Sequence, residues 1–111
     1  MVPLDSAVDY EAMSRSMLQR RLIDVSERLT KVRAELKVSD EQVSYLQGEA
    51  DDARLRAIVS ETPLASGEER EAQRHADTLA RYRDDLRRAI QELEEERDAL
   101  LDRMSAELAE S

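Results

Sequence analysis

Few side chains in this sequence are suited to catalysis or metal binding. His75 is the only histidine and there is no cysteine, which excludes a histidine-based triad, a multi-histidine metal site and a thiolate site within one chain. Glu71 lies four residues before His75, on the same helix face, with Asp51 and Asp52 near on the opposite arm. These residues make a weak metal candidate, and an exposed helix surface explains them equally. The sequence also has no glycine-rich phosphate loop, so we expect no enzyme activity, catalytic residue, metal or cofactor.

Acidic residues gather around the one break in the helical pattern. Together with a leucine they form a candidate interaction tip, which comprises Glu61, Leu64, Glu68, Glu69 and Glu71. A hairpin tip with paired carboxylates resembles, in shape only, the Gre-type and DksA-like regulators that reach into RNA polymerase. Acidic residues in the first turn of a helix also stabilise the helix dipole. Both interpretations remain open: an acidic-tip regulator of a large enzyme, or dipole stabilisation alone.

The elements that position these residues follow from a repeat of apolar side chains. From residue 18 onward the spacing alternates between four and three, and Ser39 is the one polar member. Sustained spacing of this kind is typical of a coiled coil and predicts a first helical arm over residues 18–60. The seam consists of Leu18, Leu22, Val25, Leu29, Val32, Leu36, Ser39, Val43, Leu46, Ala50, Ala53 and Ala57.

A turn interrupts the repeat. Pro63 disfavours a helical conformation at the residue before it, so the first helix should end near Ser60 or Glu61. Ser66 with Glu69 fits a capping box, which predicts a turn over residues 61–66 and a second arm over residues 67–111. A competing start lies a few residues earlier, with a threonine cap at residue 62 and Pro63 as the first helical residue.

The second arm places a leucine at every seventh residue. These leucines alternate with a second set of seam positions, of which two are arginines. Because the arms have similar lengths, we expect an all-α fold, a long antiparallel two-helix coiled-coil hairpin. The seam of this arm comprises Ala76, Leu79, Arg83, Leu86, Ile90, Leu93, Arg97, Leu100 and Met104.

Charges beside the seam indicate a register. We expect Asp40 to meet Arg87 on one flank and Arg28 to reach Glu96 on the other, with a shift of one heptad left open. The same register sets Arg21 against an arginine at position 103, a mismatch that has no explanation in the sequence. Exposed pairs of this kind specify register more than stability.

The base of the hairpin, at the end opposite the turn, has more apolar residues than the seam needs. We expect this surplus to form an interface, and a homodimer through the base is the leading hypothesis. Residues 1–17 form an N-terminal extension, helical or loose, that competes to cover the same surface. The candidate interaction base comprises Tyr10, Met13, Met17, Ile23, Leu101, Met104 and Leu108.

Charge and composition exclude several classes of partner. The net charge is -9, which disfavours free nucleic acid because binding to phosphates needs a basic surface. No apolar run approaches the roughly 20 residues of a membrane-spanning helix, and no basic amphipathic face for a membrane surface is present. The start of the chain also lacks the features of a secretory signal. We therefore expect a cytoplasmic protein whose partner is another protein of unknown identity.

The stretch from Met17 to Met104 resembles a group of short uncharacterised coiled-coil proteins from actinobacteria. The resemblance is carried by the segments Glu49-Ala50-Asp51-Asp52-Ala53-Arg54-Leu55-Arg56 and Ser60-Glu61-Thr62-Pro63-Leu64-Ala65. It implies a bacterial coiled-coil protein and no particular activity. The function expected from the residues is a non-enzymatic interaction, scaffold or adaptor protein.

Overall fold

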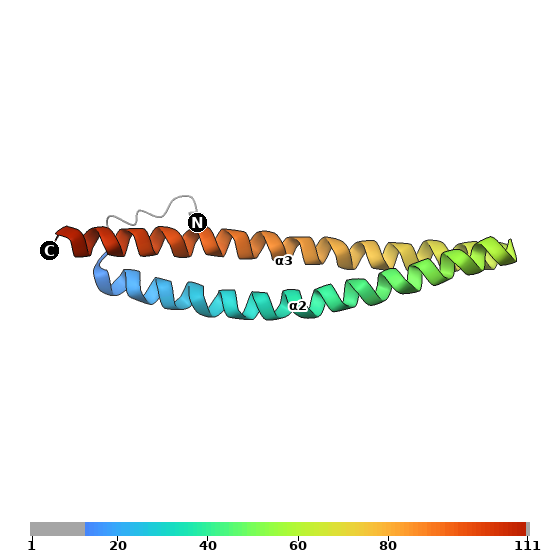
Figure 1. The fold of residues 1–111 in the computed structure, drawn as a ribbon, viewed down its shortest axis with the longest axis horizontal. Helices are drawn as coiled ribbons and strands as arrows, with labels where there is room; N and C mark the ends of the chain where they lie inside the picture. Colours follow the sequence, from blue (N-terminus) through green and yellow to red (C-terminus); the bar gives the residue numbers. More distant parts are fainter. Residues whose placement is uncertain (1–12, 111) are drawn as a thin grey trace, which may run out of the picture. The chain divides into compact units, whose positions relative to one another are not determined.

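Two long helices make up the part of the chain that the structure describes. The computed structural model describes residues 13–110, within which α2 covers Arg15–Ser60 and α3 covers Pro63–Glu110. No strand occurs between residues 13 and 110. The predicted all-α helical hairpin is confirmed. The described residues divide into two compact units, which we call the base unit (residues 13–32 and 89–110) and the turn unit (residues 33–88). In each unit a segment of α2 lies beside a segment of α3 (Figure 1).

Helix α2 begins three residues before the seam. The Ser14 side-chain Oγ accepts a hydrogen bond from the backbone N–H of Met17 at 3.2 Å. The backbone oxygen of Ser14 accepts the first helical bond, from the N–H of Leu18 at 3.0 Å. A serine in this position is a standard N-cap, because its hydroxyl satisfies an amide that has no partner within the helix. The cap explains why the helix starts at Arg15 rather than at residue 18.

Burial along α2 follows the predicted seam. All twelve seam residues from Leu18 to Ala57 are buried or half-buried. Between Leu18 and Ser60 only Arg21 is shielded without belonging to the seam. Ser39 is buried like its apolar neighbours, and its Oγ has no hydrogen-bond partner among the described residues. The repeat alone was therefore sufficient to predict which face of α2 packs against α3.

The core of the base unit consists of large apolar side chains. Its buried members are Leu18, Val25, Leu29, Leu93 and Leu100. Half-buried side chains complete the cluster from both helices: Met13, Leu22, Val32, Ile90 and Met104. Burying a leucine or valine contributes about 1.5–3 kcal/mol relative to leaving it exposed. The two heptad seams thus supply most of the interface in this unit with apolar side chains, and Arg97 interrupts the seam of α3.

The turn unit has a core of smaller side chains. Its buried apolar residues include Val43 and Leu86 together with four alanines, Ala50, Ala53, Ala57 and Ala76. Alanines at a helix interface let the two axes approach toward the short end of the usual range of about 8–10 Å. Small side chains also bury less apolar area than leucine does, so each alanine pair stabilises this unit less than a leucine pair stabilises the base.

The charged flanks confirm one predicted pair and correct another. In the turn unit Arg87 Nη2 lies 3.4 Å from Asp40 Oδ1, as expected. In the base unit Glu96 pairs with Arg21, whose Nη2 lies 2.8 Å from Glu96 Oε2, and not with the expected Arg28. Arg21 therefore has an acidic partner and does not depend on Arg103. Arg103 instead lies 3.7 Å from Glu107 Oε1.

The turn occupies only Glu61 and Thr62. Glu61 adopts the left-handed region with φ 52°, and its N–H donates to the oxygen of Ala57 at 3.0 Å, which is the αL form of helix termination. The Thr62 Oγ1 then accepts from the N–H of Ala65 at 3.2 Å. The capping box at Ser66 was therefore wrong and the competing start is the observed one. Pro63 is favoured at the first helical position because it has no N–H to leave unsatisfied.

We predict that Glu61→Gly stabilises the protein. A residue with a Cβ pays about 1–2 kcal/mol in the left-handed region, and the greater freedom of glycine in the unfolded chain offsets part of this gain. The expected net increase in the free energy of unfolding is about 0.5–1 kcal/mol. It is measured by urea unfolding followed by far-UV circular dichroism.

Thr62→Ala provides the matched control at the neighbouring position. Loss of the N-cap should lower the free energy of unfolding by about 1 kcal/mol. If Glu61→Gly left the stability unchanged or lowered it, the turn geometry described here would be wrong.

Candidate protein-interaction surfaces

Many large apolar side chains of the described residues are exposed. Seven buried core residues are larger than alanine: Leu18, Val25, Leu29, Val43, Leu86, Leu93 and Leu100. Eleven large apolar residues are exposed: Met17, Ile23, Val38, Tyr45, Leu55, Ile58, Val59, Leu64, Tyr82, Leu101 and Leu108. Single exposed apolar residues are ordinary, whereas groups of them mark interfaces. The exposed set divides into three surfaces, one in the base unit and two in the turn unit.

The base surface consists of Met17, Ile23, Leu101 and Leu108, all of which are exposed. Leu101 and Leu108 are one heptad apart and so lie on the same face of α3. Two other members of the candidate base, Met13 and Met104, pack against the core cluster instead of facing outward. Met104 was also predicted on the seam, as its packing confirms, whereas Met13 was expected on the surface because a sequence pattern does not show how far the core extends. Tyr10 lies outside the described residues.

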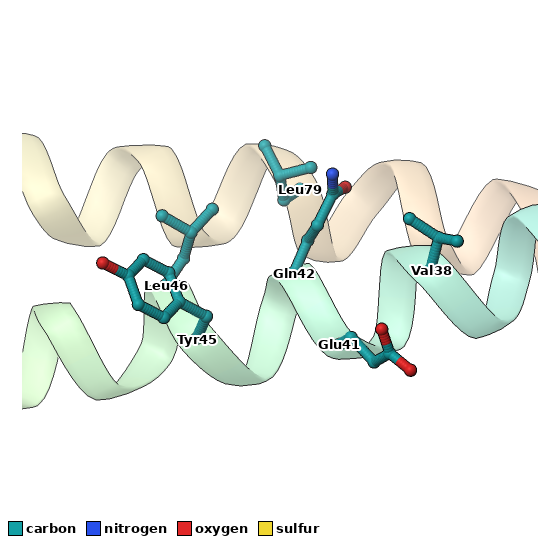
Figure 2. A pocket seen from close by; sticks show the side chains of 6 residues that line it. All are labelled: Val38, Glu41, Gln42, Tyr45, Leu46 and Leu79. Carbon is teal, nitrogen blue, oxygen red and sulfur yellow. The ribbon is translucent and has the colours of Figure 1, made fainter.

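A groove in the turn unit was not expected from the sequence. It has a volume of about 420 Å³ and is lined by Val38, Glu41, Gln42, Tyr45, Leu46 and Leu79. Figure 2 shows Tyr45 and Leu46 at one end, Val38 at the other, and Leu79 entering from α3. The groove is open and mostly apolar, which suits a side chain of a partner better than a small substrate that must be enclosed.

A second hollow continues this groove along the turn unit. It measures about 350 Å³ and is lined by Ala34, Glu35, Val38, Ser39, Gln42 and Tyr82. Val38 and Gln42 belong to both hollows. The Tyr82 hydroxyl donates to Glu35 Oε2 at 3.4 Å, which holds an exposed aromatic ring beside the apolar strip. Two tyrosines therefore border the combined groove, and tyrosine is enriched at protein interfaces.

The turn surface consists of Leu55, Ile58, Val59 and Leu64, which are all exposed, Val59 by 84%. Leu55, Ile58 and Val59 follow helical spacing and share one face of α2, whereas Leu64 lies in the first turn of α3. Of these four residues, only Leu64 was predicted from the sequence as an interaction residue. Leu55, Ile58 and Val59 show helical spacing in the sequence, but they do not occupy seam positions.

The acidic residues of the candidate tip differ in their exposure to solvent. Glu61, Glu68 and Glu71 are exposed, whereas Glu69 is half-buried. Glu69 is seven residues before Ala76 and therefore falls on the seam side of α3. Because α3 begins at Pro63, its first turn contains no acidic residue. The helix dipole acts within the first turn, so dipole stabilisation does not account for these acids.

Residues 13–110 contain neither a metal-binding cluster nor a membrane-spanning stretch. No group of three or more histidine, aspartate or glutamate side chains is arranged to hold a metal ion there. Neither helix has a stretch long and apolar enough to cross a membrane. His75, with Glu71 one turn before it, is exposed on α3, in line with an ordinary solvated helix face.

Comparison of the chain with family models, with curated proteins and with solved structures finds no match in any of the three.

A matched pair of leucine truncations tests whether these surfaces serve folding. Leu55 is 62% exposed and Leu86 is 8% exposed, and both lie in the turn unit. We expect Leu55→Ala to change the free energy of unfolding by less than about 0.5 kcal/mol. Leu86→Ala should lower it by about 2–4 kcal/mol because it removes core packing. Both values come from urea unfolding, and equal losses would show that Leu55 is part of the core.

Proposed function

We propose that the protein is a non-enzymatic interaction or scaffold protein of the cytoplasm. The observation that supports this most directly is the set of eleven large apolar side chains that are exposed in residues 13–110. A partner that covers such side chains removes apolar area from water, which favours association. The grooves described above are open, and an open apolar surface suits recognition of another helix.

Within this proposal the base surface joins two copies of the chain. Leu101 and Leu108 stack on one face of α3, and Ile23 adds a third large apolar side chain from α2. A two-fold interface needs a patch that is complementary to itself. An apolar patch meets this requirement because it does not place charges of the same sign opposite each other. Pairing of two hairpins yields a four-helix arrangement, in which each two-helix seam is covered on a further side.

The test is sedimentation equilibrium of the full chain at micromolar concentration. We expect a dimer, and we expect the triple variant Ile23→Gln, Leu101→Gln, Leu108→Gln to weaken dimerisation at least about tenfold, since each substitution removes buried apolar area. The control Leu55→Gln, Ile58→Gln, Val59→Gln changes three comparably exposed residues and should leave the dimer intact. A wild-type chain that stays a folded monomer contradicts assembly through the base.

A second candidate function uses the turn end as a regulator that binds a large enzyme such as RNA polymerase. It is favoured by the position of Glu68 and Glu71, which are exposed beyond the first turn of α3 and so are not explained by the helix dipole. The adjacent Leu64 is 74% exposed. An apolar side chain between acidic residues can anchor the turn while the carboxylates meet basic groups of the enzyme.

Charge reversal separates this candidate from the scaffold function. The variant Glu61→Lys, Glu68→Lys, Glu71→Lys should lose binding to purified RNA polymerase in a pull-down if the turn is the regulatory element, because each reversal places like charges together. The base-mediated dimer should persist in the same variant. Absence of wild-type binding to the polymerase contradicts this candidate and leaves the scaffold function standing.

A further inference from the structure

Helix α2 carries a second heptad pattern on the face opposite its seam. We call this set the outer stripe; its spacing alternates between four and three, and all eight of its members are exposed. Each lies two residues after a seam position, which corresponds to about 200° around the helix. The outer stripe comprises Ala34, Val38, Glu41, Tyr45, Gly48, Asp52, Leu55 and Val59.

The outer stripe is apolar where the corresponding face of α3 is polar. Apart from Glu41 and Asp52, the stripe consists of apolar residues and one glycine. The equivalent positions of α3 in the same unit are Thr78, Arg81, Asp85 and Arg88. Both faces are exposed, so solvent alone would favour the polar composition on each. A helix with apolar residues on two opposite faces is suited to packing between two neighbours.

Gly48 lies at the centre of the outer stripe and has no packing role within the chain. A Cβ built at this position would meet nothing within 4 Å. Glycine inside a helix is destabilising relative to alanine, so the residue weakens α2 with no compensation from the described neighbours. A glycine on an exposed helix face allows another backbone to approach closely. It therefore points to a neighbour beyond residues 13–110.

The two acidic residues of the stripe indicate that this neighbour is not a second copy. An antiparallel pairing that sets Tyr45 against Gly48 also sets Glu41 against Asp52. A parallel pairing sets each acidic residue against itself. Each arrangement that matches the apolar residues therefore brings carboxylates together, and like charges across an interface reject a partner.

We propose that the outer stripe binds an amphipathic helix of a different protein, with an apolar face and two basic side chains about three turns apart. The basic residues meet Glu41 and Asp52, and a small residue between them packs over Gly48. Val38, Glu41 and Tyr45 also line the groove of about 420 Å³, so the bound helix contacts its edge. This inference rests on the proposed interaction function and specifies the chemistry of the partner.

A designed peptide provides the probe. The peptide is a helix of about eight turns with leucines on one stripe, alanine at its centre and arginines at the two levels of Glu41 and Asp52. The order of apolar and acidic residues along the stripe is similar in both directions. A symmetric peptide can therefore bind in either orientation. Fluorescence anisotropy with the full chain should give a micromolar dissociation constant.

Charge exchange supplies the specific readout. The variant Glu41→Arg, Asp52→Arg should bind the arginine peptide at least about tenfold more weakly, and a peptide with glutamates at the two levels should restore binding. Gly48→Leu should abolish binding although the chain becomes no less helical and more stable than the wild type. The control Glu92→Arg, Glu95→Arg makes the same charge change at exposed positions of α3 and should leave the affinity unchanged.

Several outcomes overturn the proposal. One is equal affinity of the wild type and the Glu41→Arg, Asp52→Arg variant for the arginine peptide, and another is failure of the glutamate peptide to restore binding. A third is a change in the oligomeric state of the chain without peptide when Gly48 is replaced by leucine, measured by sedimentation equilibrium. This result would show that the stripe binds a second copy of the chain.

Affinity capture with the full chain separates the two proposals. If wild type and the Glu41→Arg, Asp52→Arg variant retain the same cellular proteins, the stripe proposal is wrong and the interaction function stands. If the wild type retains none and sediments as a monomer, the interaction function itself is wrong.

Discussion

Burial of apolar residues along a two-helix seam is the interaction on which the structure depends. A helix that packs against a single neighbour buries only two positions in each heptad. In α2 those positions are occupied by Leu18, Val25 and Leu29 in the base unit and by alanines near the turn. The other positions of α2 between Leu18 and Ser60 are exposed, apart from Arg21. Apolar residues at exposed positions add little to the packing of the hairpin, and we propose that they contact other molecules.

The seam could be predicted from the sequence because its signal repeats. Twelve positions of α2 agree with a single period, so a polar exception such as Ser39 does not disturb the assignment. The ends of the helices depend on single residues and were harder to assign. Both Ser66 and Thr62 are good caps in isolation, and the choice between them depends on Glu61, which enters the left-handed region despite its Cβ. Residue preferences alone do not anticipate such a strained position.

The flanking charges show a second limit of sequence-based reasoning. Arg21 and Arg28 occupy the same heptad column, so either can face Glu96 when the register is known only to within one heptad. The structure selects Arg21, and the Glu96 side chain is only 12% exposed in that pair. The burial of Glu96 depends on how the surrounding core packs. The spacing of charged residues in the sequence gives no information about this packing. Pairing of Asp40 with Arg87 on the other flank was predictable because few alternatives exist there.

The candidate surfaces were predicted only in part. Ile23, Leu101 and Leu108 lie beside the seam and were predicted as surplus apolar residues, whereas Met13 packs against the core and Met104 packs there as its seam position also predicted. The outer stripe was not predicted, because Glu41 and Asp52 interrupt its pattern. Once α2 has a defined buried face, the same two acids become informative. They make an apolar stripe selective, since they oppose self-association and favour a basic partner.

The central claim is that the exposed apolar surface of this hairpin binds other proteins. The most direct test is site-specific photo-crosslinking in the source cell, with a photoreactive amino acid in place of Tyr45 on the outer stripe or of Arg81 on the polar face of α3. Both positions are exposed in the turn unit, so they differ in surface chemistry and not in accessibility. We predict that position 45 crosslinks to a discrete partner protein and that position 81 does not. Equal crosslinking from both positions, or none from either, would contradict the account.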